Sequence, residues 1–147
     1  MTSGTELRES RTPAFEFILV ICGIWLVGLG LYFVFFRPSL LPEDLRYMGA
    51  TLREIQSAAP GLSRWLQRVF AVMGGFMMGA GVLTMYLVTN LARLRKKWTL
   101  ITAAFAGLST VGLMSLTNFL LDSDFKWLLL IPALLWAVGL VLYQRHE

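Results

Sequence analysis

The sequence predicts an all-α fold, an integral membrane four-helix bundle with short interfacial helices between the first two spans. Hydrophobic residues make up 56% of the 147 residues and charged residues only 15%, whereas a soluble domain contains about 25% charged residues. Four stretches without a charged side chain approach or reach the roughly 20 apolar residues that a helix needs to cross a bilayer. Because lipid offers no hydrogen-bond partner to the backbone, each of these stretches should be helical.

The whole chain is expected to form a single membrane domain, with residues 37–68 as the only sizeable extramembrane segment. The first apolar run follows Arg8 and Arg11, as a signal peptide would. The run is too long for a signal peptide, however, and it does not end in small residues, so we expect it to remain as a membrane helix. The predicted spans are residues 17–36, 69–88, 100–121 and 127–143.

The segment 37–68 is predicted to contain short helices. Pro42 suits the first position of a helix, and two acids follow it where the helix dipole favours them. Gly49 can end this helix, and Thr51 with Glu54 fits a capping box that starts the next one. These helices have an apolar side and should lie on the membrane surface or over the mouth of the bundle. A packed connection is favoured over a lid or a partner-docking surface, and both interpretations stay open.

Part of the chain resembles a known group of proteins. The run Leu41-Pro-Glu-Asp-Leu45, the glycine at position 49, the segment 51–62 and the glycine-rich second span resemble the corresponding region of small, uncharacterised bacterial four-span membrane proteins. The resemblance implies a four-span topology and a bacterial source, hence the inner (cytoplasmic) membrane. It carries no site residues over to this chain.

The short loop 91–98 has the densest positive charge in the sequence. Basic loops tend to stay in the cytoplasm, and an even number of spans places both termini on one side, so we expect both termini in the cytoplasm. Five arginines in the segment 37–68 weaken this assignment. The loop can also contact anionic lipid headgroups, and it is too short to indicate nucleic-acid binding. Its cationic residues are Arg93, Arg95, Lys96 and Lys97.

Small residues in the second span suggest where helices approach each other closely. Ala71, Gly75 and Gly79 form a small-xxx-small ladder on one face, and Gly74 and Gly81 lie on a neighbouring face. Small side chains allow membrane helices to pack with their backbones close together. We therefore expect the face with Gly75 and Gly79 to make the tightest helix contact.

The third span is the most polar of the four. One narrow stripe follows helical spacing through Ala103, Gly107, Thr110, Met114 and Thr117. Such a stripe can pack against another helix or line a polar pathway, and packing is favoured. We expect Ala103 and Gly107 to be helix-packing positions.

Few residues in the chain could carry chemistry. There is one histidine and one cysteine, and no motif for phosphate, dinucleotide or zinc binding is present. Glu16, one residue before the first apolar run, could be an ion or proton site because charge near the hydrocarbon is unusual. An interfacial acid favoured by the helix dipole is the preferred interpretation. We therefore expect no enzyme activity, no metal and no cofactor.

These features favour a structural or accessory membrane protein, a small subunit that packs against other subunits of a larger membrane complex. The alternatives are a small homo-oligomeric transporter or channel and, less favoured, a membrane protein that interacts with a lipid or a quinone. The expected partners are membrane lipids, including anionic headgroups at the 91–98 loop, and other membrane proteins.

Overall fold

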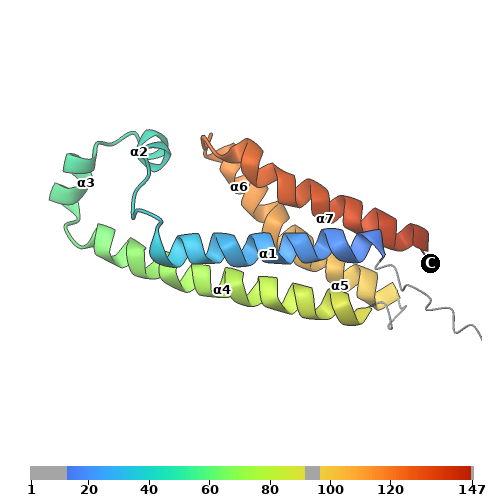
Figure 1. Ribbon diagram of the computed structural model, residues 1–147. Coiled ribbons are helices and arrows are strands. Elements are labelled where there is room, and N and C mark those ends of the chain that lie inside the picture. Colours follow the sequence, from blue (N-terminus) through green and yellow to red (C-terminus); the bar gives the residue numbers. More distant parts are fainter. Residues whose placement is uncertain (1–12, 92–96, 147) are drawn as a thin grey trace, which may run out of the picture.

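The computed structural model describes residues 13–91 and 97–146. All regular secondary structure in these residues is helical, and four long apolar helical spans pack together with two short helices between the first and second spans (Figure 1). The predicted fold class is confirmed. The protein is a multi-pass membrane protein with four spans.

The predicted apolar stretches lie inside the long helical spans, except that Phe36 and Leu121 fall one residue beyond the helix ends. Several helices extend further than the stretches, and the helix of the second span already begins at Leu62. The third span is divided into three helical pieces, of which the middle one, η1, is a π-helix. The elements are α1 (Ala14–Phe35), α2 (Pro42–Met48), α3 (Leu52–Ala58), α4 (Leu62–Leu91), α5 (Lys97–Gly107), η1 (Leu108–Gly112), α6 (Leu113–Leu120) and α7 (Lys126–His146).

Helix α2 begins and ends where the sequence predicts, and α3 begins where it predicts. Pro42 is the first residue of α2, and Gly49 ends it with a left-handed φ of 63°. Glycine adopts such a φ without steric cost. The N–H of Thr51 donates to Glu54 Oε2 at 2.7 Å, and the N–H of Glu54 donates to Thr51 Oγ1 at 3.3 Å. The predicted capping box at the start of α3 is thus confirmed.

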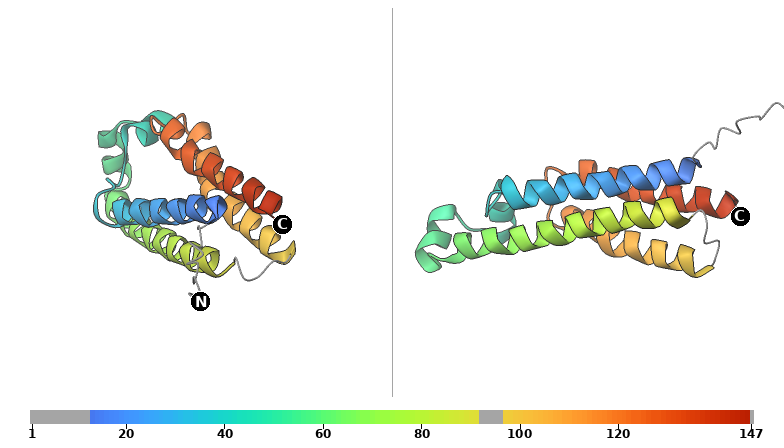
Figure 2. Two further views of the ribbon diagram at one scale, coloured as in Figure 1. Left: turned by 45° about the vertical axis from the view of Figure 1, so that its right-hand side comes forward. Right: turned by 60° about the horizontal axis from the view of Figure 1, so that its bottom comes forward.

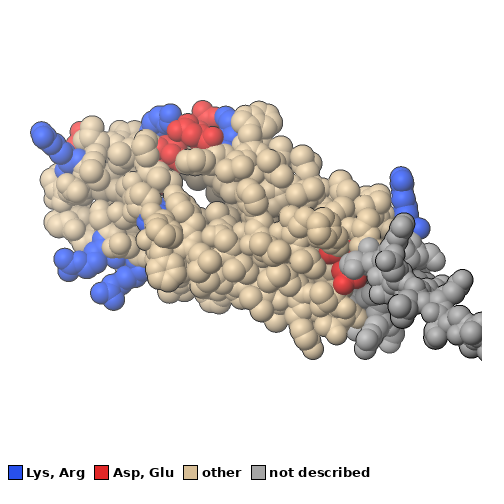
Figure 3. Space-filling model, in the orientation of Figure 1, with Lys and Arg blue, Asp and Glu red and all other residues tan. Residues whose placement is uncertain are grey.

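Charged side chains gather at the two ends of the molecule. Figure 3 shows a broad band without lysine, arginine, aspartate or glutamate between these ends. The spans run along this band. A membrane protein should have this distribution, because burying charge in hydrocarbon is costly.

Helices α1 and α4 run antiparallel and pack along their length (Figure 2). Their backbones meet at two pairs of glycines, Gly23 with Gly81 and Gly30 with Gly74. A Cβ atom added to Gly74 would lie 2.5 Å from the carbonyl oxygen of Gly30, and one added to Gly81 would lie 2.5 Å from that of Gly23. Seven residues separate the glycines on each helix, so both pairs stay in register.

The expected contact through Gly75 and Gly79 is not made among residues 13–91 and 97–146. A Cβ atom added to either glycine would have no heavy atom within 4 Å, and both residues are exposed. Consecutive residues of a helix point about 100° apart. Gly74 faces α1, and Gly75 is therefore turned away from it. Ala71 is only half-buried, and the close approach uses the neighbouring face of α4.

Helix α7 packs against both α1 and the third span. The indole of Trp136 lies against Gly107, and its Nε1–H donates to the carbonyl oxygen of Ala103 at 3.0 Å. Ala103 and Gly107 therefore lie at a contact between α5 and α7. Pro132, inside α7, is fully buried. The buried core comprises Leu19, Cys22, Leu26, Val88, Val111 and Trp136.

The two helix pairs, α1 with α4 and the third span with α7, are joined unevenly. They converge at the end where Val88, Thr99 and Ala103 line one small apolar pocket. Among the described residues, α4 makes few other contacts with the third span. Helix α1 therefore lies between α4 and α7, and the side of the bundle between α4 and the third span is loosely packed.

Candidate functional site

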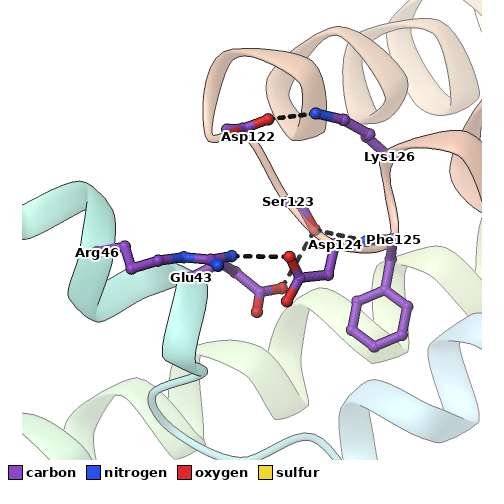
Figure 4. A network of polar contacts seen from close by, with 7 residues as sticks. All are labelled: Glu43, Arg46, Asp122, Ser123, Asp124, Phe125 and Lys126. Carbon is purple, nitrogen blue, oxygen red and sulfur yellow. Dashed lines mark hydrogen bonds and ion pairs between the residues drawn. The ribbon is translucent and has the colours of Figure 1, made fainter.

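A network of polar side chains joins α2 to the turn between α6 and α7 (Figure 4). We call it the cap network. It lies at the ends of the spans, with Lys126 as the first residue of the fourth, on the side of the molecule where the two helix pairs separate. Its members are Glu43, Arg46, Asp122, Ser123, Asp124, Phe125 and Lys126.

The centre of the cap network is a buried hydrogen bond. Ser123 Oγ donates to Glu43 Oε1 at 3.1 Å, and these residues are 2% and 5% exposed. The same Ser123 oxygen accepts from the N–H of Phe125 at 3.2 Å, just before α7 begins. A buried carboxylate needs such partners, because burying it without a hydrogen bond would destabilise the folded protein by roughly several kcal/mol.

Two ion pairs surround this hydrogen bond. Arg46 of α2 contacts Asp124 at 2.8 Å, with both side chains largely exposed, and its hydrogen bond to Asp124 raises the pKa of Arg46. Lys126 pairs with Asp122, and its hydrogen bond lowers the pKa of Asp122. Asp122 has a positive φ of 49°, which aspartate adopts more readily than most residues. This conformation lets the chain turn tightly from α6 into α7.

Arg37 connects α2 to the ends of the first two spans. Its guanidinium lies 3.6 Å from the centre of the Phe70 ring of α4 and 5.2 Å from that of Phe33 of α1. It also pairs with Asp44 at 3.4 Å, and Asp44 accepts from the N–H of Leu41 at 2.8 Å. A cation–π contact that is shielded from water contributes about 1–2 kcal/mol.

The arrangement holds helices together. Glu43 and Arg46 attach α2 to the α6–α7 turn, while Arg37 attaches it to α1 and α4. Figure 3 shows an opening below α2, between α1 and the third span, that these contacts bridge. Within the described residues, no group of three or more histidine, cysteine, aspartate or glutamate side chains could hold a metal ion.

Within the part of the chain that the structure describes, the site residues predicted from the sequence do not form one site. Glu16 lies in the first turn of α1, and the cap network is at the other end of that helix. Gly75 and Gly79 lie on an exposed side of α4, and Ala103 and Gly107 lie against Trp136. Of the predicted lipid-binding loop, Arg93, Arg95 and Lys96 fall outside the described residues, as does the side chain of Lys97.

Three polar residues of the third span donate hydrogen bonds to their own helix. Thr110 Oγ1 and Ser109 Oγ donate to the carbonyl oxygen of Ala106 at 2.6 and 3.2 Å, and Asn118 Nδ2 donates to that of Met114 at 2.9 Å. A π-helix shifts the usual backbone hydrogen bonds, and the two hydroxyls supply additional donors to the helix just before η1. Within the stripe, the hydroxyl of Thr110 thus bonds to its own helix, as a helix-packing position allows.

The sequence analysis did not identify the glycine pairs at which α1 meets α4, or the buried hydrogen bond of the cap network. The pairs Gly23–Gly81 and Gly30–Gly74 could have been found from their equal seven-residue spacing in two adjacent spans. The hydrogen bond between Glu43 and Ser123 joins residues 80 positions apart, and no local sequence pattern predicts it.

Loss of the buried hydrogen bond should destabilise the protein. We expect Ser123→Ala to lower the free energy of unfolding by about 1–3 kcal/mol, because it leaves the Glu43 carboxylate buried without this donor. Thermal unfolding in detergent would measure the change. The matched control, Arg46→Gln, removes an exposed ion pair and should cost only about 0–1 kcal/mol. A larger loss in Arg46→Gln than in Ser123→Ala would contradict this ranking.

No protein-family model, curated protein or solved structure matches the chain. The resemblance to small bacterial membrane proteins is therefore supported only by the four spans, and no family is identified.

Proposed function

We propose that this protein is a structural or accessory subunit that packs against other proteins within a larger membrane complex. The role is one of assembly rather than catalysis. The observation that supports it most directly is the loosely packed side of the bundle between α4 and the third span. A bundle that functions alone would be expected to bury the facing sides of these spans against each other.

The side of α4 that a partner would contact follows from the position of Gly74. Gly74 faces α1, so Met73 and Gly75 lie about 100° to either side of it. Val88, which lines a pocket with residues of the third span, lies by helical spacing about 40° from Gly74, in the direction of Met73. Met73 is exposed, and methionine adapts to irregular partner surfaces. A transmembrane helix of another subunit would fit here.

The cap network supports the same role. It links the two helix pairs through α2 at the end where they separate. This link fixes the distance between the pairs, and with it the width of the loosely packed side. The self-bonded polar groups of the third span favour a subunit over a transporter. The bacterial inner membrane, with both termini in the cytoplasm, remains the proposed location, on the basis of the basic 91–98 loop.

Gentle detergent extraction of the tagged protein from its native membrane, followed by native electrophoresis, tests the proposal. We expect a discrete complex in which the chain is present with at least one different protein at constant stoichiometry. A species that contains only copies of this chain would support the transporter alternative. A monomer that carries lipid or quinone would support the third alternative, and either result would contradict the proposal.

A further inference from the structure

Two arginines lie near the N-terminal end of α4, on a second side of this helix. This side is turned away from α1 and from the loosely packed side of the bundle. Arg64 and Arg68 are exposed and one helical turn apart, so they share a face. Three other cations on this end of the molecule, Arg37, Arg46 and Lys126, are each paired with an aspartate. Neither Arg64 nor Arg68 has such an ion pair within the described part of the chain.

The packing of α1 against α4 fixes the depth of these arginines in the membrane. Arg68 is two residues before Phe70, and the Phe70 ring lies 3.6 Å from the guanidinium of Arg37, at the end of the first charge-free stretch. Arg68 is therefore at the edge of the hydrocarbon. Arg64 is about 6 Å further out, within the roughly 5–8 Å headgroup layer of one leaflet. Both guanidinium groups can reach lipid phosphates.

The same side of α4 continues into an apolar surface with two glycines. Gly75 is seven residues after Arg68 and shares its face, and space is open beside both Gly75 and Gly79. Val72 and Phe76, 60% and 76% exposed, are the apolar neighbours of these glycines. The surface thus has a cationic end at headgroup depth and an exposed apolar stretch below it. A phospholipid has the same order of chemical groups, with an anionic phosphate above an acyl chain.

We propose that this surface binds an anionic phospholipid, with its phosphate held by Arg64 and Arg68 and an acyl chain along Val72, Gly75 and Gly79. Arginine presents several N–H donors in a planar fork that matches phosphate oxygens. Each arginine near an anionic membrane surface contributes about a fivefold gain in binding. Trp65, exposed beside Arg64, suits the membrane interface. The inference does not depend on the proposed assembly role, since it concerns a different side of α4.

Native mass spectrometry of the detergent-purified full chain, titrated with phosphatidylglycerol or phosphatidylcholine, tests the site. We expect the wild-type protein to prefer phosphatidylglycerol. Arg68→Gln should reduce that preference about fivefold, and the double variant Arg64→Gln/Arg68→Gln by up to about 25-fold. The charge-conserving Arg64→Lys/Arg68→Lys should keep most of it. An unchanged preference in the Gln double variant would overturn the proposal.

Two further comparisons make the test specific. Arg53→Gln removes an exposed arginine of α3 and should leave the preference unchanged. A loss equal to that of Arg68→Gln would show general electrostatic attraction and overturn the site. A photoreactive benzoylphenylalanine at Val72, activated in native membranes, should give an adduct of phospholipid mass. An adduct with a protein, whether a second copy or another chain, or the absence of any lipid adduct, would overturn the assigned occupant.

Discussion

Gly74→Leu is expected to separate α1 from α4 and to give the largest loss of stability of any single change considered. A Cβ atom at this position would lie 2.5 Å from the carbonyl oxygen of Gly30 and 3.0 Å from Phe33 Cβ. Neither atom can move without shifting the backbone of α1. Overpacking of this kind typically costs on the order of 1–3 kcal/mol, occasionally more.

The adjacent glycine provides a matched control. Gly75→Leu makes the same chemical change one residue later, where no heavy atom lies within 4 Å of the added Cβ, and it should be nearly neutral. The unfolding transition and the monodisperse fraction after purification would be compared for the two variants. Equal tolerance of both changes, or greater sensitivity at Gly75, would show that α1 and α4 do not meet through Gly74.

The second large effect is expected for Gly107→Val. An added Cβ would lie 2.2 Å from Trp136 Nε1, so the indole would have to leave its place. Its hydrogen bond to the carbonyl oxygen of Ala103 would be lost along with the packing. We expect a destabilisation on the order of 1–3 kcal/mol from overpacking alone.

Tryptophan fluorescence and thermal unfolding would both report this change, because Trp136 would move to a new environment. Gly28→Val is the control, since a Cβ at Gly28 has open space around it. A wild-type emission spectrum and an unchanged unfolding midpoint in Gly107→Val would show that α5 and α7 are not in contact at this point.

The spans and the short helices could be predicted from the sequence because their causes are local. A charge-free stretch of sufficient length must be helical in lipid, and Thr51 and Glu54 define a helix start within four residues. These features need no knowledge of what the helix packs against.

The packing face of α4 could not be predicted in the same way. The sequence offers small residues on two neighbouring faces, at Gly75 and Gly79 and at Gly74 and Gly81, and both allow close approach. Only the partner helix decides between them, through the matching glycines at Gly23 and Gly30.

The cap network and the π-helix in the third span depend on tertiary structure. Glu43 is buried because the α6–α7 turn supplies Ser123 as its partner, and the sequence shows only an acid at a helix start. The π-helix at Leu108–Gly112 lies next to Gly107, where the third span packs against Trp136. The sequence indicated small and polar residues there, without a change of helix type.

Site-specific photo-crosslinking at Met73 in native membranes tests the proposed assembly role most directly. A photoreactive residue there faces the loosely packed side of the bundle, and the same residue at Val82 serves as a control on the side of α4 shared with Gly75. We expect the Met73 variant to form one adduct with a different membrane protein, at a yield well above that of the Val82 variant. Adducts only between copies of this chain, or equal yields from the two positions, would contradict a subunit that receives its partner between α4 and the third span.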